Sequence, residues 1–139
     1  MRTRVLVLFA LAALLAGCGS ATVVAPTAVT VVGSLPTAAP VAKGDAVAGK
    51  KLFLSSGCGG CHAFKAAATN GKVGPDLDNL AADATKANQG SLAEYVFTSI
   101  KNPSAYVVPG YPNGVMPNYG AQLTDTQIAD ITAFLTQSS

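Results

Sequence analysis

The chain has 139 residues, which suits one domain with an appendage, and half of them are apolar although few are aromatic and none is tryptophan. Its formal net charge of +2 depends on Arg2 and Arg4 near the N-terminus. Without these two residues, seven lysines balance seven acidic residues. The charge therefore provides no basic surface for nucleic acid, which we exclude as a partner.

The first 17 residues have the pattern of an export signal. Arg2 and Arg4 give a positive start, and residues 5–15 form an uninterrupted apolar run. This run is shorter than the roughly 20 residues of a membrane-spanning helix, but it suits the central part of a signal peptide. We predict a signal peptide over residues 1–17, with an uncleaved N-terminal anchor as the alternative.

A cysteine follows the apolar run. Leu15, Ala16, Gly17 and Cys18 resemble the bacterial lipobox, in which the cysteine is lipidated and becomes the first residue after cleavage. The resemblance implies a diacylglycerol on Cys18, usually with a further acyl chain, and about two chains give stable anchoring. We therefore expect an extracytoplasmic lipoprotein, held to a membrane in the periplasm or on the outer face of the cell membrane.

Residues 18–42 predict a linker. Beyond Cys18 this stretch has no charged and no aromatic residue, and three prolines interrupt it. Such a composition cannot build a packed core, so we expect a disordered, semi-extended tether. A short strand built from its valine pairs is the alternative. Charged residues return at Lys43, and we predict one domain over residues 43–139.

The domain begins with a predicted helix. Asp45 is a good N-cap for a helix that ends at Ser55 or Ser56. By their spacing, three residues of this helix share one face: Ala46, Gly49 and Phe53.

A second helix is predicted by the capping box of Ser91 and Glu94, and it ends at Asn102 because Pro103 follows. Its apolar residues lie one turn apart: Leu92, Val96 and Ile100. The capping box of Thr124 and Gln127 opens a last helix, whose expected buried stripe is Ile128, Ile131, Phe134 and Leu135. We find little strand signal, so we predict an all-α domain. Its core is thin, and such domains usually need a metal, a staple or a cofactor.

Three chemistries use a Cys-x-x-Cys pair such as Cys58 and Cys61. A thioredoxin-type redox pair lies in a strand–helix pattern, whereas the flanks here are helical. A zinc site needs four ligands, and carboxylates would have to complete one here, because Cys18 is lipidated and His62 is the sole histidine. In c-type haem attachment, Cys-x-x-Cys-His, both thiols form thioethers with the haem and the histidine binds iron. This interpretation accounts for every cysteine and histidine, and we predict one haem c.

Met116 is the candidate for the sixth iron ligand. No second histidine exists, and Met116 is the only methionine that remains after signal cleavage. It lies in a loop, residues 102–122, that contains four prolines and three glycines. An isolated methionine is more often a filler of the core, but a haem that lacks a ligand favours coordination. Together, His62 and Met116 predict a raised reduction potential relative to bis-histidine ligation.

In chain order, these motifs resemble the class I cytochromes c over residues 45–137. Gly49 and Phe53 lie where that family packs its first helix against the last, and Phe134 lies where the last helix supplies an aromatic partner. Met116 and the helix after it resemble the family's methionine loop and C-terminal helix. The resemblance implies about three to five helices around one covalent haem, with the tether in front.

The segment Gly74-Pro75-Asp76-Leu77 resembles the family's Gly-Pro-x-Leu motif. In the family, the proline carbonyl accepts a hydrogen bond from Nδ1–H of the haem histidine, and the leucine touches the ring. The resemblance therefore implies that Pro75 orients His62 and that Leu77 packs on the haem.

The chain departs from the family in two features. The tryptophan that contacts the haem propionates is missing, and so is the ring of lysines that steers soluble mitochondrial-type cytochromes. Four residues are candidates for the propionate contacts, or else simply line the underside of the loop: Tyr106, Tyr111, Asn113 and Tyr119.

The resemblance implies a single-electron carrier rather than an enzyme. Its expected partners are a quinol-oxidising complex as donor and a terminal oxidase or a photosynthetic reaction centre as acceptor. One alternative is a fixed haem subunit of such a complex. Another is a haem-based sensor or peroxidase-like enzyme in which Met116 leaves the iron.

Overall fold

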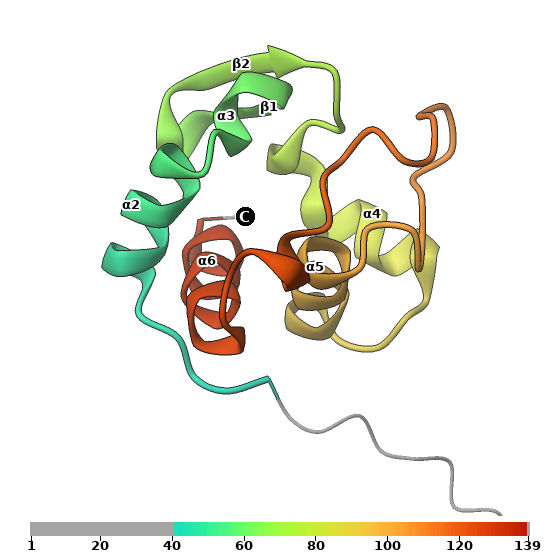
Figure 1. Ribbon diagram of the computed structural model, residues 1–139. Coiled ribbons are helices and arrows are strands. Elements are labelled where there is room, and N and C mark those ends of the chain that lie inside the picture. The colour runs from blue at the N-terminus through green and yellow to red at the C-terminus, as the bar shows by residue number, and fades with distance from the viewer. Residues whose placement is uncertain (1–40, 139) are drawn as a thin grey trace, which may run out of the picture. The chain divides into compact units, whose positions relative to one another are not determined.

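The computed structural model describes residues 41–138. The predicted signal peptide, Cys18 and the linker as far as residue 40 lie outside the described residues. Within residues 41–138 there are five α-helices and one two-stranded sheet, so the predicted small, mainly helical fold is confirmed (Figure 1). The helices are α2 (Ala46–Ser55), α3 (Cys58–Cys61), α4 (Leu80–Ala87), α5 (Leu92–Lys101) and α6 (Asp125–Gln137).

The first and last of these helices, α2 and α6, pack directly against each other (Figure 1). Gly49 makes this contact possible, because a Cβ at this position would overlap the carbonyl oxygen of Asp130. The side chain of Asp130 also accepts a hydrogen bond of 2.7 Å from the backbone N–H of Asp45. Asp45 in turn caps α2 as predicted, by accepting from the N–H groups of Val47 and Ala48.

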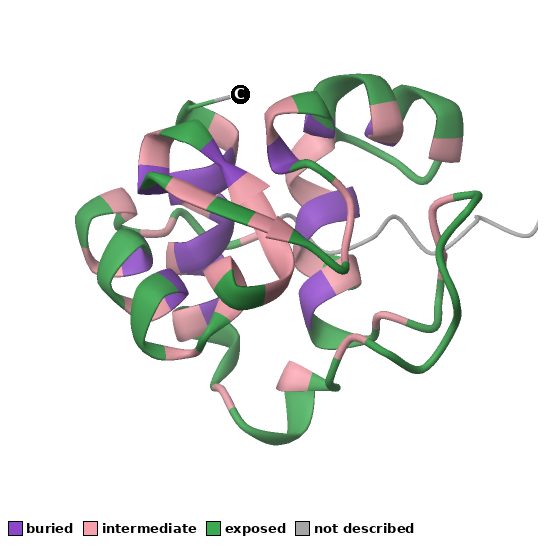
Figure 2. Ribbon diagram, turned by 90° about the horizontal axis from the view of Figure 1, so that it is seen from above, coloured by how far each residue is buried: buried purple, intermediate pink, exposed green. Residues whose placement is uncertain are grey.

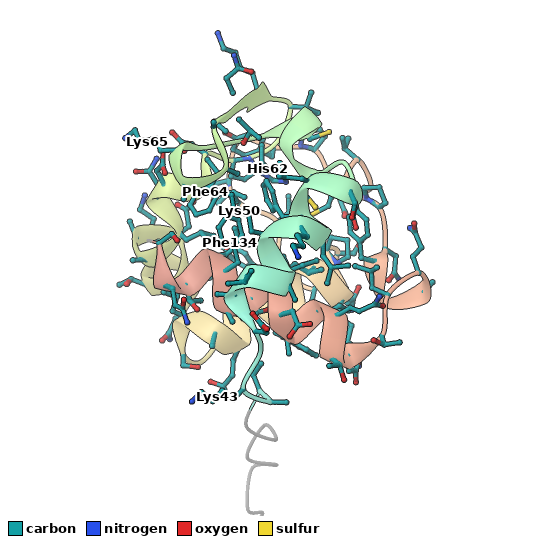
Figure 3. All side chains as sticks on the ribbon, turned by 90° about the vertical axis from the view of Figure 1, so that its left-hand side faces the viewer. Lys43, Lys50, His62, Phe64, Lys65 and Phe134 are labelled. Carbon is teal, nitrogen blue, oxygen red and sulfur yellow. The ribbon has the colours of Figure 1, made fainter. Side chains whose placement is uncertain are left out.

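Three phenylalanines from different elements form the centre of the core, and Figure 3 labels two of them, Phe64 and Phe134. Phe53 of α2, Phe64 of the strand β1 (His62–Phe64) and Phe134 of α6 have ring centroids 5.4 to 6.1 Å apart, within the range of favourable aromatic contacts. Lys50 covers one side of the cluster, since its Nζ lies 5.9 Å from the centre of the Phe134 ring and donates to the carbonyl of Ala66. This cluster fixes the segment that carries His62, two residues before Phe64.

Both predicted capping boxes are present. At α5 the Ser91 side chain accepts from the N–H of Glu94, and the Glu94 carboxylate accepts from the N–H of Ser91. Thr124 and Gln127 form the same pair at α6. The apolar stripes of α5 and α6 face the interior (Figure 2). The buried residues of these two helices are Tyr95, Val96, Ile100, Ile128, Ala129, Ile131, Thr132, Phe134 and Leu135.

The sequence did not predict the hairpin of β1 (His62–Phe64) and β2 (Thr69–Lys72). The two strands are antiparallel, and the ladder is irregular between His62 and Ala63. Thr69 Oγ1 donates to the carbonyl of His62 at 2.9 Å, which ties the hairpin to the end of the Cys-x-x-Cys-His motif. The hairpin therefore belongs to the construction of the site rather than to a larger sheet.

The helix α4 was also not predicted. Its N-cap residue Asn79 makes no side-chain capping bond, so the sequence carries no start signal for this helix. Its buried residues are Leu80 and Ala84, and it ends at Asn88 in the left-handed conformation. Beyond α5, the chain from residue 102 to residue 124 has no α-helix and no strand, apart from the short 3₁₀ turn η3 (Tyr119–Ala121). None of the helices formed by residues 41–138 is long and apolar enough to cross a membrane.

Candidate functional site

A cavity of about 1270 Å³, measured out to its open mouth, lies inside the helical domain. The residues expected at the haem site all line it: Cys58, Cys61, His62, Pro75, Leu77 and Met116. Residues nearly 60 positions apart in the sequence thus line the same cavity.

The two cysteines lie at the first and last positions of α3, a single helical turn. Both thiols are free and partly exposed. Burial raises the pKa of the Cys58 thiol above its ordinary value, although a backbone hydrogen bond and one from Tyr119 oppose the shift. The helical turn brings both sulfur-bearing side chains to the same cavity, as a two-point attachment requires.

His62 is held by the residues of the Gly-Pro-x-Leu segment. Its Nδ1 lies 2.8 Å from the carbonyl oxygen of Pro75, and a carbonyl can only accept, so Nδ1 carries the proton. In the neutral ring the lone pair therefore lies on Nε2, the atom that can bind a metal. Gly74 leaves room for the ring, because a Cβ there would lie 2.8 Å from Nδ1.

The main chain brings Pro75 to His62 through Cys61. The carbonyl oxygen of Cys61 accepts hydrogen bonds from the N–H groups of Val73 and Gly74, at 3.0 and 2.9 Å. These bonds close the turn that follows β2. The cysteine that would hold the haem thus also positions the residue that orients the histidine.

The walls of the cavity are mainly apolar. Leu77 is buried, and α5 contributes Tyr95, Val96 and Ile100. Burial, with a smaller effect of the Asp83 charge, raises the pKa of Tyr95, so this phenol stays neutral at physiological pH. An apolar hollow with sulfur and imidazole donors on its wall fits a large flat cofactor such as a porphyrin.

Met116 is partly buried and packs against the core from the loop before α6. Within this loop Ser104 Oγ and Asn113 Oδ1 are hydrogen-bonded at 2.9 Å. Most residues of the loop are exposed (Figure 2). The loop therefore offers the Met116 thioether to the cavity but is held by few contacts of its own.

The four residues considered for propionate contacts all line the cavity, and several already have protein partners. Tyr106 packs edge-on against Tyr95 with centroids 6.0 Å apart, and Asn113 is bonded to Ser104. The Tyr119 hydroxyl donates to the carbonyl of Ser56 at 3.2 Å. The role of these residues toward the propionates stays a prediction.

Sequence reasoning missed part of the cavity wall. Val73, Leu80, Val107, Val108 and Leu123 also line it. Of these residues, only Val107 and Val108 could have been found from the sequence, because two adjacent valines are unusual in a loop rich in proline and glycine. Val73 and Leu123 lie outside the helices and strands, and Leu80 begins α4, whose N-cap residue Asn79 makes no side-chain capping bond.

The rival chemistries find little support in the described residues. Across residues 41–138 no three His, Cys, Asp or Glu side chains are grouped closely enough to hold a metal ion as a zinc site would need. The Cys-x-x-Cys turn leads into a two-stranded hairpin rather than following a strand of a larger sheet, unlike a thioredoxin-type site.

Comparison with models of protein families matches residues 46–139 to the family described as Cytochrome c. A search of curated proteins returned no match to the chain. The match covers most of the chain and includes α2 to α6, so it contains the whole cavity. Proteins of this family generally carry electrons, and their domains are typically extracytoplasmic. The chain belongs to the cytochrome c family and binds a covalent haem c through Cys58 and Cys61.

Proposed function

We propose that the protein is a single-electron carrier in which His62 and Met116 are the two axial ligands of the haem iron. One observation carries this proposal: His62, with Nδ1 bonded to Pro75, lines the same cavity as Met116. The iron supplies the chemistry by alternating between the ferric and ferrous states. The protein's part is to keep both ligands unchanged in the two states.

The chemistry of the two side chains suits this task. The Pro75 carbonyl keeps the proton on Nδ1 of His62, so that Nε2 remains a donor. Met116 provides a neutral thioether, which disfavours the ferric charge relative to a second imidazole and so raises the potential. Two protein ligands leave no position for oxygen or peroxide, which supports a carrier rather than an enzyme.

The tether determines where the electrons are exchanged. A lipid on Cys18 would hold the domain near the membrane on its outer side, at a high effective concentration for membrane-bound partners. The balance of lysines and acids after signal cleavage makes electrostatic steering weak. We therefore assign to the protein a shuttle between a quinol-oxidising complex and a terminal oxidase or reaction centre.

Carbon monoxide distinguishes the carrier from a sensor or enzyme. Holo-protein matured with covalent haem is reduced and mixed with carbon monoxide, with Met116→Ala as the matched control. The carrier predicts slow and incomplete binding by the wild type and fast binding by the variant, which has a free coordination position. Fast binding by the wild type, equal to that of Met116→Ala, would contradict the proposed ligation and favour sensing or catalysis.

A further inference from the structure

Tyr119 connects two parts of the site that are distant in sequence. It opens η3, three residues after Met116, and its side chain packs against the core. Its hydroxyl donates to the carbonyl of Ser56, which is 63 residues earlier and two residues before Cys58. One phenol thus touches the segment that attaches the haem.

The position of Ser56 at the end of α2 explains why its carbonyl needs a hydrogen-bond donor from elsewhere. Ser56 is the C-cap of α2, and the last carbonyls of a helix lack partners within the helix. The N–H of Ser56 bonds back to Leu52, while its carbonyl receives the Tyr119 hydroxyl. Burial raises the pKa of Tyr119, so the hydroxyl remains a donor at neutral pH.

The main chain of Tyr119 is hydrogen-bonded to the residues just before α6. Its carbonyl accepts from the N–H groups of Gln122 and Leu123, at 3.0 and 2.8 Å, directly before the Thr124 cap. Tyr119 therefore bridges the end of α2 and the beginning of α6. These two helices pack against each other through Gly49, so the bridge rests on the most closely packed part of the domain.

The loop in front of Tyr119 has only weak means to hold a ligand. The hydrogen bonds given above and the turns at Ala105 and Tyr111 join residues within the loop itself. A thioether is a weak neutral ligand that stays on iron only when its segment is fixed in place. The nearest fixed residue after Met116 that reaches another element through its side chain is Tyr119.

We propose that Tyr119 is a positioning residue that ties the Met116 segment to the Cys58 segment and so keeps the thioether on the iron. This inference rests on the proposed ligation by Met116. It gives Tyr119 a role toward the sulfur ligand and the attachment helix, different from the propionate contact considered from the sequence. The aromatic ring fills the core, and the hydroxyl provides the link.

The test is ligand exchange in the ferric holo-protein. Tyr119→Phe keeps the ring and removes the hydroxyl. Ser104→Ala, which removes a hydroxyl that bonds to Asn113 within the same loop, is the matched control. Imidazole is mixed with each protein, and the loss of the methionine–iron charge-transfer band is followed well below the unfolding temperature. We expect exchange to be about threefold to tenfold faster in Tyr119→Phe, as the loss of one hydrogen bond to another element predicts, and unchanged in Ser104→Ala.

Three outcomes would overturn the proposal, and each would locate the failure in a different step of it. Exchange at the wild-type rate in Tyr119→Phe would show that the hydroxyl does not hold the ligand. Equal acceleration in both variants would show a general effect of the loop. A wild-type protein without the methionine–iron band would place the failure in the proposed ligation itself, and the role of Tyr119 would fall with it.

Discussion

Nδ1 of His62 lies 2.8 Å from the carbonyl oxygen of Pro75, across 13 residues of chain. The contact depends on two main-chain bonds to the carbonyl of Cys61 and on the space that Gly74 leaves beside the ring. The attachment motif and the orientation of its histidine are therefore parts of one local structure. A substitution that weakens the contact between His62 and Pro75 should therefore alter the ligation of the iron even where the fold is kept.

Gly74→Ala tests this relationship. The added Cβ would lie 2.8 Å from Nδ1, so the imidazole must tilt and the bond to Pro75 must weaken. We expect a lower yield of correctly ligated holo-protein and a shifted reduction potential, because contacts that orient a metal-binding histidine control how well it binds the metal. Visible spectra and a redox titration measure both quantities.

Gly60→Ala is the control for that variant, because a Cβ at Gly60 meets open space. It should leave the potential and the holo yield near the wild-type values. Identical spectra and potentials for Gly74→Ala and the wild type would show that Gly74 does not control the histidine.

The α2–α6 contact should be sensitive to any side chain at Gly49. In Gly49→Ala the Cβ would overlap the Asp130 carbonyl, so the helices must separate, and such overpacking typically costs about 1–3 kcal/mol. Val47→Ala, on the exposed side of the same helix, should change the free energy of unfolding by less than about 0.5 kcal/mol. Denaturant unfolding of the holo-proteins gives both values, and equal stabilities would refute the close contact.

The capping box of α5 gives a dependence on pH. The backbone N–H and side chain of Ser91 lower the pKa of Glu94 below its ordinary value. The charged carboxylate thus adds stability that is fully present above the unfolded-state pKa and is lost as pH falls through the lower, folded-state pKa. We expect the stability difference between the wild type and Glu94→Gln to be constant near neutrality and to shrink in this acidic range. A difference that stays constant down to pH 3 would contradict the assignment.

The parts of the fold that the sequence predicted are those with local causes. Asp45, Ser91 and Thr124 each cap a helix through groups two or three residues away, and the buried stripes follow from helical spacing. The Cys-x-x-Cys-His motif is equally local, which is why haem attachment could be predicted without a structure. Pro75 and Leu77 came from the resemblance to the class I cytochromes c, and the contact of Pro75 with His62 is indeed present.

The missed features depend on contacts distant in sequence. The strands β1 and β2 have few β-branched residues, and their pairing follows from how Cys61 and Thr69 bind the chain around His62. Tyr95 lay outside the predicted stripe of α5, yet it is buried against Tyr106. The Tyr119–Ser56 bond spans 63 residues, and no periodicity or motif indicates it.

The proposed lipid on Cys18 leads to a prediction about kinetics. Because the charges balance once the signal peptide is removed, raising the salt concentration should slow electron transfer to a membrane oxidase only slightly. Cys18→Ala, exported through a cleavable signal, should slow it far more, because the high local concentration is lost. Turnover is measured with membranes at matched cytochrome amounts. A larger effect of salt than of the tether would refute this account.

The visible and near-infrared spectrum of the ferric and ferrous protein, matured with covalent haem, tests the ligation by His62 and Met116 most directly. We predict a c-type haem spectrum with the weak red charge-transfer band of methionine bound to ferric iron. That result would establish Cys58, Cys61, His62 and Met116 as one site. Covalent haem without this band would contradict the ligation by Met116, and with it the assignment of the protein as a simple electron carrier.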